Sequence, residues 1–124
     1  NKYDENALSI SGFTREEHKT FENPKEVMTR FKEWVNGIGN CIFISDNPCY
    51  DWSFINYYFH KFTNGNPFGY SGQRIGDKFQ GFYNDPFYKW KKHRITKYTH
   101  NPVDDAKGNA EALLYLYKQG YKLF

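Results

Sequence analysis

The pattern of apolar positions along the 124-residue chain predicts three long helices. In each of them apolar residues recur every three or four positions, so that they fall on one face. The predicted helices lie within 23–39, 51–62 and 103–119. The residues expected to face the core are Val27, Phe31, Trp34, Val35 and Ile38 in the first, Trp52, Ile55, Tyr58, Phe59 and Phe62 in the second, and Ala106, Ala110, Leu113, Leu114 and Tyr117 in the third.

Between these helices the sequence changes character. Residues 40–45 (NCIFIS) are a short apolar run rich in β-branched and aromatic residues, which predicts a buried strand of a parallel sheet. Residues 63–72 predict a loop, and 74–94 predict short helices broken around Asn84. The order helix, strand, helix, loop, helix is typical of an α/β domain, and the length suits a single domain over 1–124.

Capping residues mark the ends of two predicted helices. The first 14 residues predict a connector, and Thr14 at its end is placed to cap a short helix. Asn23 stands in the N-cap position of the first long helix, and Gly37 or Gly39 is placed to end it.

Composition narrows the classes of function. The net charge of +3 comes from 17 basic and 14 acidic residues, a balance compatible with a polyanionic ligand that does not require one. Cys41 and Cys49 are accompanied by no Cys/His cluster at zinc spacing, which argues against a zinc site and for free thiols in a reducing compartment. No apolar run approaches the roughly 20 residues that span a bilayer, so we expect a cytoplasmic protein without membrane contact.

Two stretches carry more polar and ionisable residues than their local structure needs. Asn47 and Asp51 follow the predicted strand, and ligands bind beyond the carboxyl ends of strands in open α/β sheets. His100 stands five positions before Asp105 at the start of the last helix, whose cap is one of Asn101, Asp104 and Asp105. This spacing lets a loop imidazole and a first-turn carboxylate converge on one cleft, where they suit metal-assisted hydrolysis.

These two stretches carry a family resemblance. Residues 100–106 (HNPVDDA) resemble the third motif of the DEDDh-type 3′-5′ exonucleases, which include oligoribonucleases and polymerase proofreading subunits. Residues 44–56 (ISDNPCYDWSFIN) resemble the second motif, and 6–17 (NALSISGFTREE) resemble the segment that leads into it. The resemblance runs in the family's order over most of the chain.

The resemblance implies a ribonuclease H-like fold, with a central sheet flanked by helices, and two-metal hydrolysis of nucleic-acid phosphodiesters. By motif position Asp51 and Asp105 are metal ligands, His100 is the general base and Asn47 is a positional residue at the substrate. The implied cofactor is Mg²⁺ or Mn²⁺, with two ions in a complete domain, and the implied partner is single-stranded nucleic acid or its 3′ end. The motifs leave RNA and DNA equally open.

The family's first motif, Asp-x-Glu, occurs nowhere in the sequence. We therefore expect a domain truncated at its N-terminus, without the central strand and two of the four carboxylates. This predicts little or no nuclease activity for the chain alone, although the parent domain is expected to be active. The open sheet edge is expected to be completed by a missing N-terminal segment or by a homodimer.

Two rival functions come from the remaining features. The basic cluster, defined as Lys89, Lys91, Lys92, His93 and Arg94, suits a non-catalytic nucleic-acid-binding module. Alternatively, the chain is an assembly module in which the motif residues are relics. The glycine-rich stretch 65–77 lacks a dinucleotide-binding fingerprint and is interpreted as a structural loop.

Overall fold

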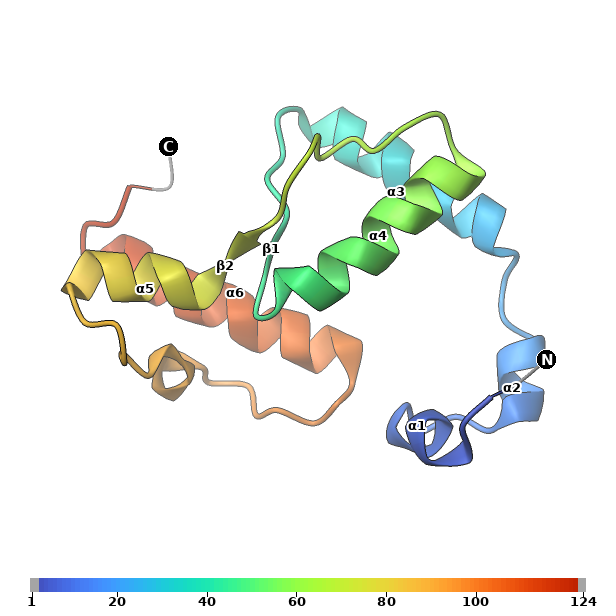
Figure 1. Cartoon of the computed structure of the whole chain (residues 1–124), viewed down its shortest axis with the longest axis horizontal. Coiled ribbons are helices and arrows are strands. Elements are labelled where there is room, and N and C mark those ends of the chain that lie inside the picture. The colour runs from blue at the N-terminus through green and yellow to red at the C-terminus, as the bar shows by residue number, and fades with distance from the viewer. Residues whose placement is uncertain (1–2, 123–124) are drawn as a thin grey trace.

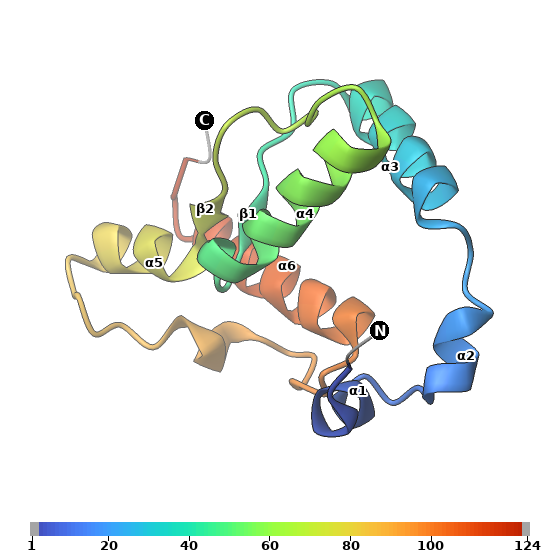
Figure 2. The same cartoon turned by 45° about the vertical axis from the view of Figure 1, so that its right-hand side comes forward.

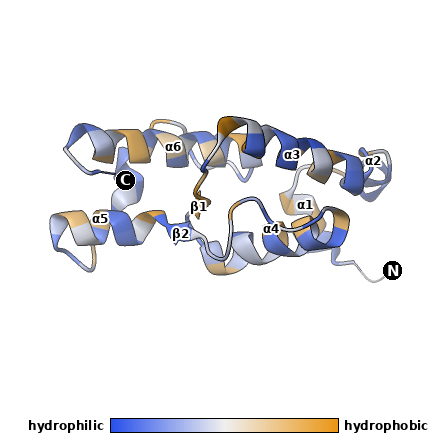
Figure 3. Ribbon diagram, turned by 90° about the horizontal axis from the view of Figure 1, so that it is seen from above, coloured by the Kyte–Doolittle hydropathy of each residue, from blue (hydrophilic) through white to orange (hydrophobic). Residues whose placement is uncertain are grey.

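Two layers of helices lie on either side of a short parallel β-sheet in the computed structural model, which describes residues 3–122 (Figure 1). Seen from above, α3 and α6 form one layer, α4 and α5 form the other, and the strands lie between them (Figure 3). These helices span Pro24–Ile38 (α3), Pro48–Phe62 (α4), Ile75–Tyr83 (α5) and Pro102–Lys118 (α6). This arrangement is compatible with the predicted α/β class. None of the described helices combines the length and apolar character needed to cross a membrane.

The sheet consists of β1 (Ile44–Ser45) and β2 (Gln73–Arg74), paired in parallel with Ile44 opposite Gln73. The last two residues of the predicted strand 40–45 therefore do form a parallel strand. The sequence did not predict β2, because it is two exposed polar residues that run directly into α5. Helices on both faces cover the sheet, as a parallel sheet requires.

The predicted long helices are confirmed, with small shifts at their ends. Asn23 caps α3 by accepting from the Lys25 amide at 2.9 Å, and Gly39 ends the helix. Helix α4 begins at Pro48, three residues before its predicted start. The expected break in 74–94 also occurs: α5 stops at Asn84, which has a left-handed conformation, and η1 (Trp90–His93) follows as a 3₁₀-helix.

The first 14 residues are not simply a connector, which corrects the prediction. They contain α1 (Glu5–Ile10), because the Asp4 carboxylate accepts from the amides of Asn6 and Ala7 and caps the first turn. The short helix predicted after Thr14 is confirmed as α2 (Arg15–Lys19), where Thr14 and Glu17 form a reciprocal capping box. Helix α1 lies beside the start of α6 although the two are far apart in the sequence (Figure 2).

A cluster of fully or nearly fully buried side chains forms the core between α5, η1 and α6. Its members are Ile75, Phe79, Trp90, Ala112 and Leu116, each at most 5% exposed. Elsewhere Val35 of α3 and Phe59 of α4, both predicted to face the core, are also buried. Cys41 and Cys49 are free thiols, as predicted.

The predicted core faces of α3 and α6 need correction. On α3, Val27, Trp34 and Ile38 are 39%, 64% and 59% exposed. On α6 the buried residues are Gly108, Ala112 and Leu116. The four residues of α6 that were expected in the core and are exposed instead are Ala106, Ala110, Leu114 and Tyr117. The reason is that α5 and η1 pack on the other side of α6.

Candidate active site

The turn from β1 into α4 positions the two residues of the second motif. Asn47 is the N-cap residue of α4, and its carbonyl accepts from the amides of Tyr50 and Asp51 at 3.0 Å. Asp51 therefore lies in the first turn, where the positive end of the helix dipole favours a carboxylate. The turn holds Asn47 and Asp51 one helical turn apart at the carboxyl end of β1.

Three polar residues at the start of α6 make three different hydrogen bonds. Asn101 is the cap, because its side chain accepts from the Val103 amide at 2.9 Å. Asp104 accepts from the Thr99 hydroxyl at 2.8 Å. Asp105 has a different partner, because its Oδ1 accepts from Arg94 Nη2 at 3.2 Å.

His100 precedes the cap in a left-handed conformation with φ of 63°. This region is uncommon for residues with a side chain, and strained residues of this kind are concentrated at functional sites. The imidazole is exposed and packs edge-on against Tyr98, with ring centroids 4.6 Å apart. The conformation turns the chain sharply into α6, so that His100 lies just outside the first helical turn.

One hollow of about 860 Å³ is lined by all four residues predicted for the site, Asn47, Asp51, His100 and Asp105. This volume is within the range of ligand pockets, roughly 300–1,000 Å³. The other walls come from α1, β1, the segment after η1 and α6, and their lining residues include Ala7, Ile10, Phe43, Ile44, Tyr98, Ala106, Ala110 and Leu113. Two motifs about 50 positions apart in the sequence therefore meet in one concave surface.

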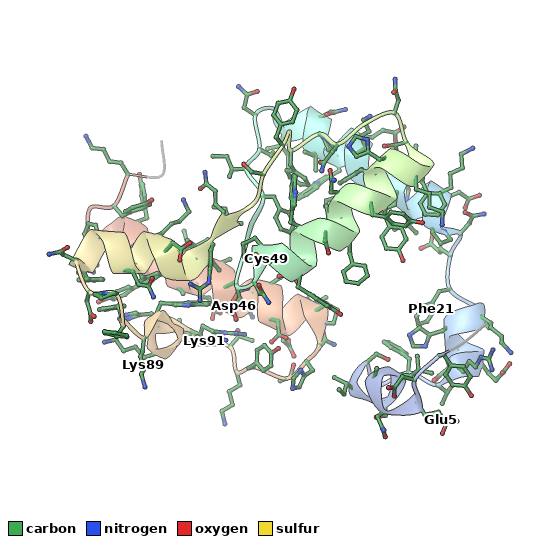
Figure 4. The ribbon with its side chains drawn as sticks, in the orientation of Figure 1. Glu5, Phe21, Asp46, Cys49, Lys89 and Lys91 are labelled. Atoms are coloured by element: carbon green, nitrogen blue, oxygen red, sulfur yellow. The ribbon has the colours of Figure 1, made fainter. Side chains whose placement is uncertain are left out.

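Basic residues of the cluster 89–94 pair with acidic residues at this hollow. Lys91 Nζ lies 2.6 Å from Asp46 Oδ2, at the end of β1 (Figure 4). Arg94 pairs with Asp105, and its own side chain is only 6% exposed. Each motif thus contributes one carboxylate that a basic side chain from the η1 region neutralises.

Two other members of the basic cluster, Lys92 and His93, lie against aromatic rings. The Lys92 ammonium lies 4.4 Å from the centre of the Tyr88 ring. The His93 ring stacks on Tyr115 at 3.8 Å, and burial, with a smaller effect of Lys92, lowers the pKa of His93 below its ordinary value. The nucleic-acid-binding alternative drew on this cluster, whose lysines Lys89, Lys91 and Lys92 are all exposed.

Glu111 is a further structural residue of the site that the sequence did not reveal. Its carboxylate accepts from the Ile95 amide at 2.9 Å, the Thr96 amide at 2.7 Å and the Thr96 hydroxyl at 2.8 Å. The hydrogen bond from the Thr96 backbone is the main cause that lowers the pKa of Glu111 below its ordinary value. Glu111 thereby fastens the segment that carries Arg94 onto α6. No sequence pattern signals this contact between residues 15 and 16 positions apart.

The donor chemistry of the hollow fits a hard cation, but the number of donors is small. Asp51 and Asp105 offer carboxylate oxygens, which Mg²⁺ and Mn²⁺ prefer. Within residues 3–122, however, no three or more acidic, histidine or cysteine side chains converge as a metal-binding group. The two carboxylates share a hollow without forming a complete coordination shell.

Comparison with known proteins gives independent support for the resemblance to 3′-5′ exonucleases. No protein-family model matches the chain. The chain is 31% identical over 117 residues to a protein named 3′-5′ DNA exonuclease Cap18 from Escherichia coli. The match covers 85% of this chain, which spans 63% of the length of that relative.

Proposed function

This chain is a distant homologue of a 3′-5′ exonuclease, and we propose that it carries part of the active site of such an enzyme. The observation that supports the proposal most directly is the shared hollow. Asn47 and Asp51 come from one motif, His100 and Asp105 come from the other, and all four line the same concave surface. The reaction proposed is hydrolysis of phosphodiester bonds from the 3′ end of single-stranded nucleic acid. DNA is the favoured substrate class, because the relative is named a DNA exonuclease.

We propose that the complete domain has a ribonuclease H-like fold. The parallel strands between two helix layers, with the site at the carboxyl end of β1, support this assignment. The short sheet leaves room for further strands, which a segment outside these 124 residues or a second copy is proposed to supply.

His100 is proposed as the general base. A left-handed residue in the loop before α6 presents an exposed imidazole at the edge of the hollow. There it is able to accept a proton from the water that attacks the phosphorus atom, a role worth roughly 10²–10⁴-fold in rate. Asn47, at the cap of α4, is proposed to orient the substrate across the hollow.

Asp51 and Asp105 are proposed to hold Mg²⁺ or Mn²⁺, two ions being expected in the complete domain, which would stabilise the charge that develops on the phosphate oxygens. Two carboxylates offset little of the charge of two divalent ions. The chain alone is therefore proposed to have little or no nuclease activity.

The test follows a 5′-labelled single-stranded DNA oligonucleotide over time with Mg²⁺ or Mn²⁺. It compares the 124-residue chain with a chimera that joins the chain to the remainder of the E. coli relative. We expect the chimera to shorten the oligonucleotide from its 3′ end, and the chain alone to leave it intact. In the chimera, His100→Ala should lower the rate by roughly 10²–10⁴-fold, and Asp51→Asn should also abolish most cleavage.

The matched control is His60→Ala, which removes an exposed histidine of α4 that does not line the hollow. If His100→Ala and His60→Ala cleave at the same rate, the assignment of the general base is wrong. Salt-sensitive binding of the oligonucleotide that persists in EDTA, with no cleavage by the chimera, would instead support a non-catalytic binding module.

A further inference from the structure

A buried arginine, Arg94, forms an ion pair with Asp105, the carboxylate that the third motif contributes to the hollow. Arg94 Nη2 lies 3.2 Å from Asp105 Oδ1, and the two side chains are 6% and 21% exposed. We propose that Arg94 is a built-in counter-ion of Asp105 and that it competes with a divalent cation for this carboxylate. The inference rests on the proposed function, since Asp105 is proposed there as a metal ligand.

Gly108, which lies one helical turn after Asp105 on α6, leaves the space in which the Arg94 guanidinium lies. A Cβ added to Gly108 would lie 2.3 Å from Arg94 Nε and 2.6 Å from Arg94 Nη2, closer than atoms approach without overlap. The backbone of Gly108 is helical, so its conformation alone does not require glycine. The missing side chain is what allows the guanidinium to lie against the helix and reach Asp105.

The segment that delivers Arg94 is also held in place. Glu111, one turn further along α6, accepts from the amides of Ile95 and Thr96, the two residues that follow Arg94. Two features therefore direct Arg94 onto Asp105. One is the space left by Gly108, and the other is the pair of hydrogen bonds by which Glu111 holds the segment after Arg94 on α6. A surface arginine that met Asp105 by chance would need neither feature.

The pairing is incomplete in a way that favours exchange. Arg94 Nε is buried and has no hydrogen-bond partner among the described residues. A buried donor without a partner is destabilising, so the unpaired Nε–H raises the free energy of the arrangement in which Arg94 pairs with Asp105. A cation that neutralised Asp105 would release the guanidinium, which then lies beside the hollow with its donors free for a phosphate oxygen of the substrate.

The experiment measures the dissociation constant of Mn²⁺ for the 124-residue chain, from the electron paramagnetic resonance signal of free Mn²⁺. The informative variant is Gly108→Ala, which keeps every charge but displaces the Arg94 guanidinium from its position against α6. Alanine also favours the helix, which helps this variant to fold. Gly81→Ala is the matched control, because it makes the same change in α5, where an added Cβ meets nothing within 4 Å.

We expect Gly108→Ala to bind Mn²⁺ about tenfold or more tightly than the unaltered chain and Gly81→Ala, because the competing charge has lost its position. Adding Asp105→Asn should cancel that gain. Should Gly108→Ala fail to fold, Arg94→Gln serves in its place with the same expectation. A second readout is the Arg94 Nε–H signal in ¹H–¹⁵N spectra, which should shift when Mg²⁺ is added to the unaltered chain.

Equal Mn²⁺ affinities in the unaltered chain and Gly108→Ala, with weaker binding in Asp105→Asn, would overturn the counter-ion proposal and leave the metal site standing. Failure of every variant to bind Mn²⁺ would overturn both the counter-ion and the metal ligands. The proposed nuclease function is judged separately, by cleavage in the chimera. The counter-ion, the metal ligands and the nuclease function can therefore be told apart by these outcomes.

Discussion

Replacing Phe79 by alanine is expected to destabilise the chain more than any exposed aromatic replacement. Phe79 is 0% exposed and joins α5 to η1, because its ring stacks with Trp90 and His93 of η1 at 6.1 and 5.5 Å. Truncating a buried phenylalanine costs about 3–5 kcal/mol in total, and two aromatic pairs worth about 0.5–1.5 kcal/mol each place Phe79 in the upper half of that range. We therefore expect a loss of about 4–5 kcal/mol, from a total stability of roughly 5–15 kcal/mol.

Urea unfolding followed by far-ultraviolet circular dichroism measures this loss. With a denaturant slope of about 2 kcal/mol per molar urea, the midpoint should fall by about 2 M. The control is Phe87→Ala, which removes the same ring from an 84% exposed position and should change stability by less than about 0.5 kcal/mol. If the two variants lose equal stability, the aromatic packing that holds η1 against α5 is not as described.

Three further predictions concern individual hydrogen bonds and ionisable groups. The pKa of Glu111 is lower in the folded chain than its ordinary value of 4.5, so its stabilisation is present above pH 4.5 and is lost as the pH falls through the folded value. Glu111→Gln should lack this acid-side loss in urea midpoints measured against pH. The pKa of His93 is lowered from 6.5, so NMR titration should find its ring less than half protonated at pH 6.5, and a folded value above 6.5 would contradict this. Asn101→Ala removes the cap of α6 and should cost about 1 kcal/mol in urea unfolding, whereas no loss would show that the cap contributes nothing.

The parts of the fold that the sequence predicted are those set by local chemistry. Thr14 and Asn23 were identified as caps because capping depends on a few neighbouring residues. The parallel strand was recognised because its run is short, apolar and β-branched, although Ile42 within it is 38% exposed. Helix α1 was missed because its helical signal is a single turn and a half that depends on the Asp4 cap.

The parts that could not be predicted depend on contacts between distant segments. The packing of α5 and η1 determines which face of α6 is buried. Ala112 and Leu116 are buried there, whereas Ala106 and Ala110 face the hollow. The strand β2 is defined by its pairing with β1, in which Gln73 lies opposite Ile44. Motif spacing indicated which polar residues share the hollow, but charge pairing with η1 needed the three-dimensional arrangement.

A map of Mn²⁺ paramagnetic relaxation over the backbone amides tests the central claim most directly. The claim is that the two motifs form one cation-binding hollow, so amides at Asn47, Asp51, His100 and Asp105 should broaden together at low Mn²⁺. The acidic pair Glu16 and Glu17 of α2, exposed and outside the hollow, should keep its amide signals. Broadening confined to α2, or to only one of the two motifs, would contradict the account.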